Sequence, residues 1–402
     1  MRASSGADAM ARLLLLSLSP IVSDPRVMRQ IQALGQEHEL NVLGFGLRPA
    51  GVHAFEAVRQ VGGASWSAAA NAVLLAARRH RLYYWRHAQI RALMHAAQRL
   101  PANRFDLVLA NDVMALPAAL ELARGAPVWL DAHEYAPREF EDRTAWRLLL
   151  GPFFDAVCRS ELGRVARMST VCDGIAQEYA ARYRLPVTVM PNCPEPMDLP
   201  VQPVADGSIR MIHHGAAIAS RRIEVMIDLM RHLDQRFSLD LMLVEQDPAY
   251  MASLRRRAQH QPRIRFVAPV AMSEIAARTN DYDIGLFLLP PVNFNYLHAL
   301  PNKFFEFIQA RLAIAIGPSP QMQALVNAHG CGVVAPGFEP ADLAGVLNAV
   351  TREQVQAMKQ ASDRAAKRWN AEATRAWLRA EVNALLEGWR PCVDAASTGE
   401  GP

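Results

Sequence analysis

The segment ALPNKFFEFIQARLAIAIG, residues 299–317, contains in turn a loop, the beginning of a predicted helix and a predicted buried strand. Its apolar residues are typical of a core. Three polar residues, Asn302, Lys303 and Glu306, nevertheless lie together in the first turn of that helix, where a helix that only packs needs none of them. The segment therefore predicts one helix–strand unit of an α/β fold, with a binding site at the helix start.

The same alternation of strand-like and helical segments extends along the chain in both directions. Short apolar runs bounded by turn residues alternate with stretches of helical periodicity, for example 25–36 and 153–166. This pattern predicts open parallel sheets covered by helices. The strand-like runs are 12–19, 39–45, 105–111, 126–132, 167–172 and 186–192 in the first half, and 209–215, 238–244, 263–268, 283–289, 312–317 and 330–336 in the second.

A proline-rich stretch at 191–208 separates the two series of strands and has little periodicity. A chain of 402 residues is also too long for one ordinary core. We therefore expect two Rossmann-like domains that face each other across a cleft. The expected divisions are a disordered leader at 1–9, an N-terminal domain at 10–192, a linker at 193–208, a C-terminal domain at 209–352, helices at 353–390 that cap the second domain or cross back to the first, and a disordered tail at 391–402.

Composition is typical of a soluble globular protein. The chain is 51% hydrophobic and 20% charged, and its formal net charge of +4 is too mild to indicate a nucleic-acid partner. No apolar run reaches the roughly 18 residues of a spanning helix, and we interpret MARLLLLSLSPIV at 10–22 as a buried strand rather than a signal peptide. The five cysteines show neither a CxxC pair nor metal-ligand spacing, which predicts reduced thiols and a cytoplasmic location.

One segment departs from the even mixture of charges. No carboxylate occurs between Glu56 and Asp106, and residues 76–104 are rich in arginine and aromatic residues. Such a helical segment can contact an anionic membrane surface or a lipid-linked acceptor, which would place the protein at the inner face of the cell membrane. A solvated basic helix face is the alternative. Nucleic acid is disfavoured, because the rest of the chain is not basic.

Ligands of parallel α/β sheets lie beyond the carboxyl ends of the strands, so the residues just after each strand are the candidates. Asp24 and Arg26 follow the first strand, and Asp112 follows the run FDLVLAN. A helix-capping role stays open for both aspartates. The DAHEY motif places His133 and Glu134 at the end of another strand, with a further carboxylate before them. A histidine in that position favours a functional role.

The second half offers two groups of candidate ligands. After the run IRMIHHG, small residues including Gly215 and Ser220 precede a helix that we expect to begin near Arg221, where free backbone N–H groups and a guanidinium suit a phosphate. In the opening segment, Asn302 is the expected helix cap, Lys303 supplies a second cation, and the carboxylate of Glu306 can accept hydrogen bonds from ribose hydroxyls. A site for phosphate alone would avoid that carboxylate, so the pattern predicts a nucleoside diphosphate.

Six segments in this order resemble family 4 glycosyltransferases of the GT-B architecture, and the resemblance covers roughly residues 11–385. It implies that the N-terminal domain faces the acceptor and that the C-terminal domain binds a nucleotide sugar. The segments are SDPRVMRQIQALGQEHELNVLGF, NDVMALPAAL, DAHEY, TVCDGIAQEYAARY, MPNCP and LPNKFFEFIQARLAIAIG.

The resemblance assigns roles to three residues and also shows departures. Arg221 matches the family's diphosphate-binding lysine, Glu306 matches the second glutamate of its E-x7-E motif, and His133 matches the histidine that contacts the donor sugar. His298 stands where the first glutamate is expected, and Ala216 stands where a diphosphate-binding arginine is expected. The glycine-rich turn after the second strand of the donor domain is replaced by VEQDPAY.

These observations predict a glycosyltransferase that moves a sugar from a nucleotide-sugar donor to a glycan or a lipid-linked acceptor. Arg221 and Lys303 would neutralise the leaving diphosphate, so neither a metal nor another cofactor is expected. The DYD at 281–283 resembles a metal-binding DxD, but Asp283 begins an apolar strand, and we treat the match as chance. The resemblance implies retention of anomeric configuration.

Alternatives to this function stay open at the level of sequence. If the enzyme inverts, a carboxylate base is required, and Asp24, Asp112 and Glu134 are the candidates. A nucleotide-sugar 2-epimerase shares the two-domain architecture, and the departures at His298 and Ala216 also suit a non-catalytic sugar-nucleotide-binding scaffold. A dehydrogenase is disfavoured, because no G-x-G-x-x-G follows the first strand. The donor base, the sugar, the acceptor and the oligomeric state are not encoded in a recognisable pattern.

Overall fold

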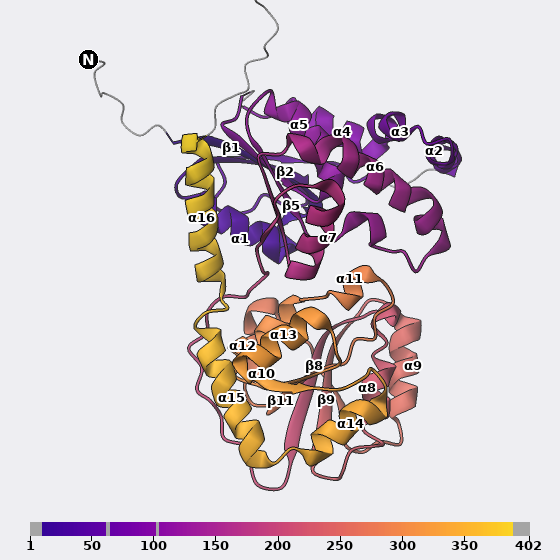
Figure 1. The fold of residues 1–402 in the computed structure, drawn as a ribbon, viewed down its shortest axis with the longest axis vertical. Helices are drawn as coiled ribbons and strands as arrows, with labels where there is room; N and C mark the ends of the chain where they lie inside the picture. Colours follow the sequence, from indigo (N-terminus) through magenta and orange to yellow (C-terminus); the bar gives the residue numbers. More distant parts are fainter. Residues whose placement is uncertain (1–9, 62–64, 102–103, 389–402) are drawn as a thin grey trace, which may run out of the picture.

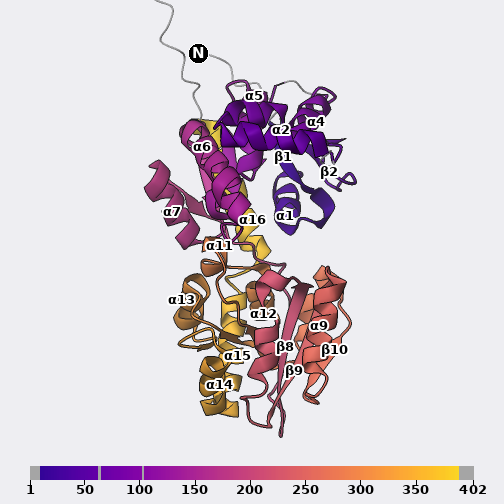
Figure 2. The same ribbon diagram turned by 90° about the vertical axis from the view of Figure 1, so that its right-hand side faces the viewer.

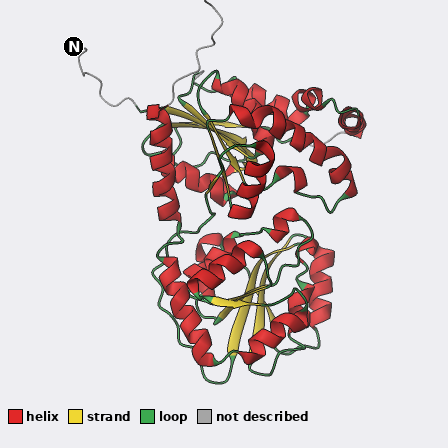
Figure 3. Cartoon of the chain, viewed as in Figure 1, coloured by secondary structure: helices red, strands yellow, loops and turns green. Residues whose placement is uncertain are grey.

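The computed structural model describes residues 10–61, 65–101 and 104–388, and Figure 1 shows them as two α/β domains, one above the other. Helices lie on both sides of the sheet in each domain (Figure 3). The predicted leader at 1–9 and tail at 391–402 lie outside the described residues.

The described part of the N-terminal domain contains a seven-stranded parallel sheet in the order β3-β2-β1-β4-β5-β6-β7. The leucines at 13–16 in β1 are fully buried, because a central parallel strand is covered on both faces. The strands are β1 (Arg12–Pro20), β2 (Glu39–Phe45), β3 (Ala54–Ala57), β4 (Leu107–Asn111), β5 (Val128–Ala132), β6 (Arg167–Thr170) and β7 (Thr188–Val189). The helices are α1 (Pro25–Leu34), α2 (Ser65–Ala76), α3 (His80–Arg86), α4 (Ala88–Ala97), α5 (Leu116–Ala123), α6 (Gly151–Glu161) and α7 (Asp173–Tyr183).

The C-terminal domain contains a six-stranded parallel sheet in the order β10-β9-β8-β11-β12-β13. Its strands are β8 (Ile209–Ala217), β9 (Phe237–Glu245), β10 (Ile264–Val267), β11 (Ile284–Phe287), β12 (Ala313–Ile316) and β13 (Gly332–Val334). Its helices are α8 (Glu224–Leu229), α9 (Pro248–Ala258), α10 (Ile275–Thr279), α11 (Phe294–Leu297), α12 (Asn302–Gln309), α13 (Pro320–His329) and α14 (Pro340–Ala349), followed by α15 (Arg352–Ala366) and α16 (Ala371–Gly388).

The predicted fold class, two Rossmann-like domains of parallel sheet that face each other, is confirmed. Every strand-like run of the sequence contains a strand, although most strands are shorter than the run. The sequence analysis missed β3, an edge strand of sequence AFEA in which no residue is fully buried. So short and half-exposed a strand has neither an apolar run nor a clear alternation to reveal it.

The last two helices lie on different domains. In Figures 1 and 2, α15 runs along the C-terminal domain and α16 lies against the N-terminal domain beside α1. Leu378 and Val382 of α16 are buried in a cluster with Leu13 and Trp129 of the first sheet. The Trp377 ring packs edge-on against Trp129, with 5.8 Å between ring centroids. The chain therefore crosses between the domains a second time.

Candidate functional site

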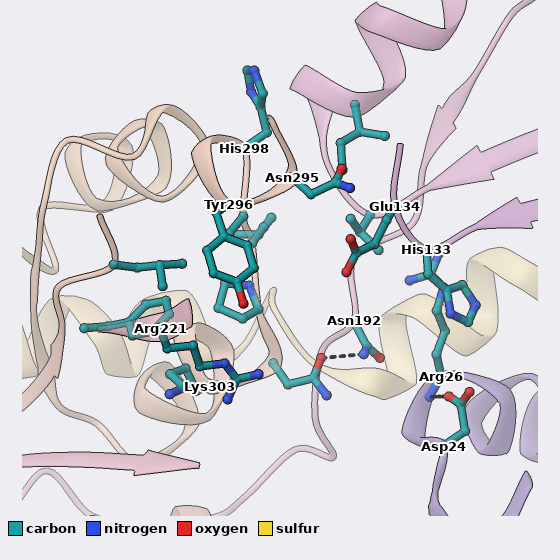
Figure 4. Close-up of a pocket in the computed structure, with 18 residues that line it drawn as sticks. Asp24, Arg26, His133, Glu134, Asn192, Arg221, Asn295, Tyr296, His298 and Lys303 are labelled. Atoms are coloured by element: carbon teal, nitrogen blue, oxygen red, sulfur yellow. Dashed lines mark hydrogen bonds between the residues drawn. The ribbon is translucent and has the colours of Figure 1, made fainter. Parts of the chain in front are cut away.

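A cavity of about 270 Å³ lies between the two domains, where the carboxyl ends of the strands of both sheets meet. We call it the central cavity. Of the predicted site residues, it brings together Asp24, Arg26, His133 and Glu134 with Arg221, Asn302 and Lys303 (Figure 4). Its remaining lining residues include Asn192, Asn295, Tyr296 and His298. The predicted residues Asp112, Gly215, Ser220 and Glu306 are not among those that line it.

Arg26 and Asp131 form a buried ion pair below the N-terminal wall of this cavity. The Arg26 Nε and Nη2 atoms each donate to an Asp131 carboxylate oxygen at 2.6 Å, and Nη1 donates to the carbonyl of Met190 at 2.7 Å. Burial by itself raises the pKa of Asp131, but the Arg26 guanidinium holds it below its ordinary value. The guanidinium is therefore engaged within the protein, although Arg26 also lines the central cavity and its acceptor-side role stays a prediction.

His133 is held at the cavity wall by polar neighbours from the end of β4. Its Nε2 lies 3.1 Å from Asn111 Oδ1, and its backbone N–H donates to Asp112 Oδ1 at 3.1 Å. The His133 Nδ1 also lies 3.5 Å from Asp112 Oδ2. Asp112 has a φ of 68°, which turns the chain so that its carboxylate faces His133. Asp112 therefore contacts His133 and is not among the residues that line the cavity.

Glu134 is the carboxylate that projects furthest into the central cavity. Figure 4 shows its side chain in the space between His133 and Tyr296. The carboxylate is open to the cleft, yet protein from both domains surrounds it and limits its hydration. That burial, with the nearby charge of Asp112, raises its pKa to about 7, while Arg221 opposes the rise. A carboxyl group in this state can exchange a proton near neutral pH.

Asp24 has a mainly structural position. One of its carboxylate oxygens accepts from the backbone N–H groups of Arg26 and Val27 at 3.1 and 3.2 Å, and the other accepts from Ser19 Oγ at 2.7 Å. It is therefore the N-cap of α1. Its oxygens are already engaged, although the residue lines the cavity.

The expectation that a helix begins near Arg221 is wrong. Residues Ala219–Arg221 form a single 3-10 turn, Arg222 takes the left-handed conformation with a φ of 50°, and α8 begins only at Glu224. The left-handed residue interrupts the helix that the apolar spacing suggested. Arg221 still lines the central cavity, and its Nη1 donates to the Ala216 carbonyl at 3.3 Å. Ser220 Oγ lies 2.9 Å from the Tyr296 hydroxyl, outside the set of lining residues.

Lys303 is a buried cation on the C-terminal wall of the central cavity, with Arg221 beside it in Figure 4. Its Nζ donates to the His214 carbonyl at 2.6 Å and lies 4.5 Å from the centre of the Phe287 ring. Burial, and then the charge of Arg221, lowers the pKa of Lys303 well below its ordinary value. Within the described residues, no carboxylate forms an ion pair with Lys303. An anionic ligand in the cavity would supply the missing negative charge.

Gly215 lets Lys303 reach this position. Its φ is 125°, and a Cβ built there would lie 3.1 Å from Lys303 Nζ. A side chain at this position would therefore be strained and would crowd the ammonium group. Gly215 was predicted to let the backbone approach a ligand closely. In this structure, its missing side chain makes room for Lys303.

Asn302 is not the N-cap that the sequence suggested. The helix α12 begins at Asn302 itself, and Pro301 holds the cap position. The Asn302 side chain instead accepts a hydrogen bond from Asn192, which lies between β7 and the linker. This contact bridges the two domains at the lower edge of the central cavity in Figure 4.

Glu306 opens into a different cavity from Lys303. This second cavity, of about 560 Å³, also lies between the domains and shares Asn302 with the central cavity. The nearest described donor to the Glu306 carboxylate is His214 Nε2, at 3.4 Å from Oε2. Burial raises the pKa of Glu306 to about 7, although Lys303 and Arg29 oppose the rise. The nucleotide site predicted as one group of residues is therefore divided over two adjoining cavities.

The raised pKa of Glu306 makes the stability of the ligand-free protein depend on pH. The carboxyl group has an ordinary pKa of 4.5 and a folded-state pKa of about 7, so the folded protein retains a proton that the unfolded chain releases in this range. Relative to a Glu306→Gln variant, the wild type should lose free energy of unfolding as pH rises from 4.5 to about 7. Chemical denaturation across this range measures the difference. A Glu372→Gln variant, changed at an exposed position, should follow the wild type; a constant difference between Glu306→Gln and wild type would refute the shift.

His298 lines the edge of the central cavity. Figure 4 shows its ring directed away from the centre of the cavity. The ring lies so close to α7 that a Cβ at Gly174 would be 2.0 Å from His298 Nδ1. Its carbonyl accepts from Cys172 Sγ at 3.2 Å. His298 therefore joins the two domains at the cavity edge.

The short helix α11, between β11 and α12, carries two residues that were not among the predicted site residues. Asn295 Oδ1 accepts a hydrogen bond from the Tyr135 backbone N–H at 2.9 Å, and Asn295 Nδ2 donates to the Tyr135 carbonyl at 3.3 Å. This pair of hydrogen bonds joins the two domains. Asn295 and Tyr296 both line the central cavity. The rule that strand ends carry ligands would have found them, because they follow a strand-like run of the sequence.

The DYD motif lies at the opposite end of its strand from the central cavity. Asp283 directly precedes β11 and accepts from Lys359 Nζ at 3.2 Å and from the Arg210 backbone N–H at 2.8 Å. Asp281 lies 3.7 Å from Arg278. In the described ranges, no cluster of His, Cys, Asp and Glu is arranged to hold a metal ion. The four cysteines within these ranges are free and buried, and Cys392 lies outside them.

The two tyrosines of the basic segment are not available to a membrane surface, whereas Trp85 is half-buried. Tyr83 and Tyr84 are buried, and the Tyr84 hydroxyl donates to the Met114 carbonyl and accepts from the Ala118 N–H. The expectation that they lie at the surface is therefore wrong. The arginines named below remain exposed, and residues 102–103 of the segment lie outside the described part. None of the helices that the structure describes is long and apolar enough to cross a membrane.

No protein-family model matches the chain, and none of the curated proteins matches it. Among solved structures, sucrose-phosphate synthase from Thermosynechococcus elongatus is similar with a TM-score of 0.71 at 10% identity, covering 94% of this chain and 99% of that chain. Anabaena Alr3699/HepE, solved in complex with UDP and glucose, gives a TM-score of 0.63 at 12% identity over 93% of this chain and 100% of its own. WaaG, a glycosyltransferase involved in lipopolysaccharide biosynthesis, gives a TM-score of 0.61 at 12% identity, over 94% of this chain and 100% of its own. At these identities the similarity establishes the fold, which is GT-B.

Proposed function

We propose that this chain is a glycosyltransferase that moves a sugar from a nucleotide-sugar donor to a glycan or a lipid-linked acceptor, without a metal or another cofactor. The observation that carries the proposal is Lys303, a buried lysine that lines the central cavity beside Arg221 and forms no ion pair with a carboxylate among the described residues. Its position beyond the strand ends is where ligands of such sheets bind. The fold shared with HepE, whose structure holds UDP and glucose, supports a nucleotide sugar as the donor.

The chemistry follows from where charge develops. The bond between the anomeric carbon and the diphosphate oxygen breaks, the diphosphate leaves with the bonding electrons, and the acceptor oxygen forms the new glycosidic bond after losing its proton. Positive groups placed beside the leaving oxygens lower the barrier. Arg221 and Lys303 supply such charge from one wall of the cavity, while His133 lies on the opposite wall, where the sugar would contact it.

The stereochemical course depends on what accepts the acceptor's proton. Resemblance to family 4 implies retention, with the leaving phosphate assisting deprotonation. Of the three carboxylates suggested as a base for inversion, Asp24 caps α1 and Asp112 lies outside the cavity lining. Glu134 is the one whose carboxylate is open to the cavity, with a pKa of about 7. Inversion would therefore use Glu134, and the anomeric configuration of the product distinguishes the two courses.

The proposal is tested by incubating the protein with labelled UDP-, GDP-, ADP- and dTDP-sugars, with and without oligosaccharide and lipid-phosphate acceptors. Transfer of label to an acceptor is the expected result. Release of free sugar without any acceptor would point instead to a 2-epimerase, which shares this architecture. Tight binding of a nucleotide sugar without turnover would favour the scaffold suggested by His298 and Ala216. A protein that binds no nucleoside diphosphate at all would refute the proposal.

A lipid-linked acceptor would place the enzyme at the inner face of the cell membrane, in polysaccharide biosynthesis. The exposed arginines of the basic segment, Arg78, Arg79, Arg81, Arg86 and Arg91, support an electrostatic contact with an anionic leaflet. Each cation near such a surface contributes about 1 kcal/mol. Because the neighbouring tyrosines are buried, the contact would rest mainly on charge, with the 46% exposed Leu82 beside the arginines.

We therefore expect the protein to sediment with anionic but not with neutral vesicles at low salt, and to be released as salt screens the charges. Changing Arg78, Arg79 and Arg81 to glutamate should abolish sedimentation. The matched control changes three exposed arginines on α9 of the other domain, Arg255–Arg257, and should leave it intact. A wild-type protein that ignores anionic vesicles at low salt would indicate a soluble acceptor.

A further inference from the structure

The second cavity is built by both domains. It is lined on the N-terminal side by the turn before α1 and by α1 itself, and on the C-terminal side by the loop before α10 and by α12, with the linker between them. It shares Asn302 with the central cavity, so one elongated ligand can extend through both. A diphosphate held near Lys303 would place the remainder of a nucleotide in this second space, beside Glu306.

Arg29 stands out among the residues of this cavity. It lies on α1, and its Nη2 is buried without a hydrogen-bond partner. Among the described residues, the Arg29 guanidinium takes part in no hydrogen bond and no ion pair. Burial, and then the charge of Arg26, lowers its pKa to about 10, while Cys193, Glu195 and Glu306 act in the opposite direction. A guanidinium held in this way has donors without acceptors, which a folded protein rarely retains without a use for them.

The walls of the cavity suit a flat ring. Val22 from the N-terminal domain and Met272 from the C-terminal domain are 48% and 54% exposed, and both line this space. Met28 lies beside them on α1. Ligand sites typically combine such apolar walls with a few convergent polar groups. Here the polar groups are a carboxylate, which suits ribose hydroxyls, and a guanidinium, which suits an oxygen acceptor.

We propose that Arg29 is a nucleotide-binding residue, and that the nucleoside half of the donor is held between the domains, with Glu306 on one side and Arg29 on the other. This inference rests on the proposed function and assigns a donor contact to the domain that would otherwise serve the acceptor. Nucleotide binding would then hold the two domains together, because one ligand would contact α1 and α12 at once.

The test is isothermal calorimetry with the full chain. Wild-type protein is titrated with UDP, GDP, ADP and dTDP, and the tightest of these is used to compare variants. Arg29→Met should weaken its binding by about ten- to a hundred-fold, the usual loss for one charge-assisted hydrogen bond. Arg29→Lys keeps the charge and loses the fork of donors, so its affinity should fall between those of the wild type and Arg29→Met. Arg59→Met, changed at an exposed position of the same domain, should bind as the wild type does.

Thermal unfolding without nucleotide separates a binding role from a structural one. Because the Arg29 guanidinium has no partner in the empty protein, Arg29→Met should melt at the wild-type temperature or above it. A lower melting temperature with unchanged affinity would give Arg29 a structural role and overturn the inference. Unchanged affinity and stability would overturn it as well. If the wild type binds none of the four nucleotides, the proposed function falls and the inference falls with it.

Discussion

Replacing Lys303 by methionine is expected to lower the rate of sugar transfer by about a hundred- to a thousand-fold, the loss typical of removing one group that stabilises developing charge. Lys303 is buried, and its ammonium group lies against the Phe287 ring and the His214 carbonyl without a carboxylate partner. A diphosphate would supply the missing negative charge. As that charge grows when the glycosidic bond breaks, the interaction strengthens, so the variant should lose kcat as well as affinity.

The measurement is the single-turnover rate at saturating donor, with the nucleoside-diphosphate affinity measured in parallel. The fold should survive, because methionine has a similar length and removes an ammonium group that burial disfavours, although Glu306 then loses a nearby group that lowers its pKa. Thermal unfolding of the empty variant checks this. Transfer at the wild-type rate by Lys303→Met would remove the lysine from the mechanism and leave Arg221 as the charge that faces the leaving group.

The sequence was informative where local patterns decide the structure. Apolar runs between turn residues identified strands in both sheets, since a buried parallel strand needs a continuous apolar run. The rule that ligands lie at strand ends brought His133, Glu134, Arg221 and Lys303 to one cavity. These inferences succeeded because each depends on residues close together in the chain.

The errors arose where distant residues decide. Arg26 lines the cavity as expected, but no local pattern indicated that it pairs with Asp131, which lies 105 positions away. The tyrosines of the basic segment were expected at the surface, but Tyr84 finds its hydrogen-bond partners on the turn and helix after β4. Neither partner could be identified from one sequence.

The division of the nucleotide site has a similar cause. Lys303 and Glu306 lie one turn apart on α12, so local reasoning placed them in one pocket. In the folded protein Asn192 reaches Asn302 from the other domain, at the point where the two cavities meet. Only the arrangement of the domains decides which cavity each side chain enters.

Lys359 offers the opposite case to Lys303, because it is a buried lysine with a partner. It lies on α15 with a fully buried side chain, and its Nζ donates to the Tyr282 carbonyl at 2.8 Å and to Asp283 Oδ1 at 3.2 Å. Lys359→Met would leave the Asp283 carboxylate buried without its cation. Breaking a buried ion pair in this way costs about 3–5 kcal/mol of the free energy of unfolding.

The same pair lies at the end of β11 that faces away from the cavities, so the two lysine variants should show opposite results. Lys359→Met should unfold at a clearly lower denaturant concentration, while its folded fraction transfers sugar at the wild-type rate. A second change, Asp283→Asn, should restore part of the lost stability, because the neutral amide oxygen can still accept from the Arg210 N–H and leaves no buried charge. If Lys359→Met were as stable as the wild type, the ion pair would contribute nothing. If it lost activity while folded, the distinction between a lysine that holds the fold and a lysine that binds the donor would fail.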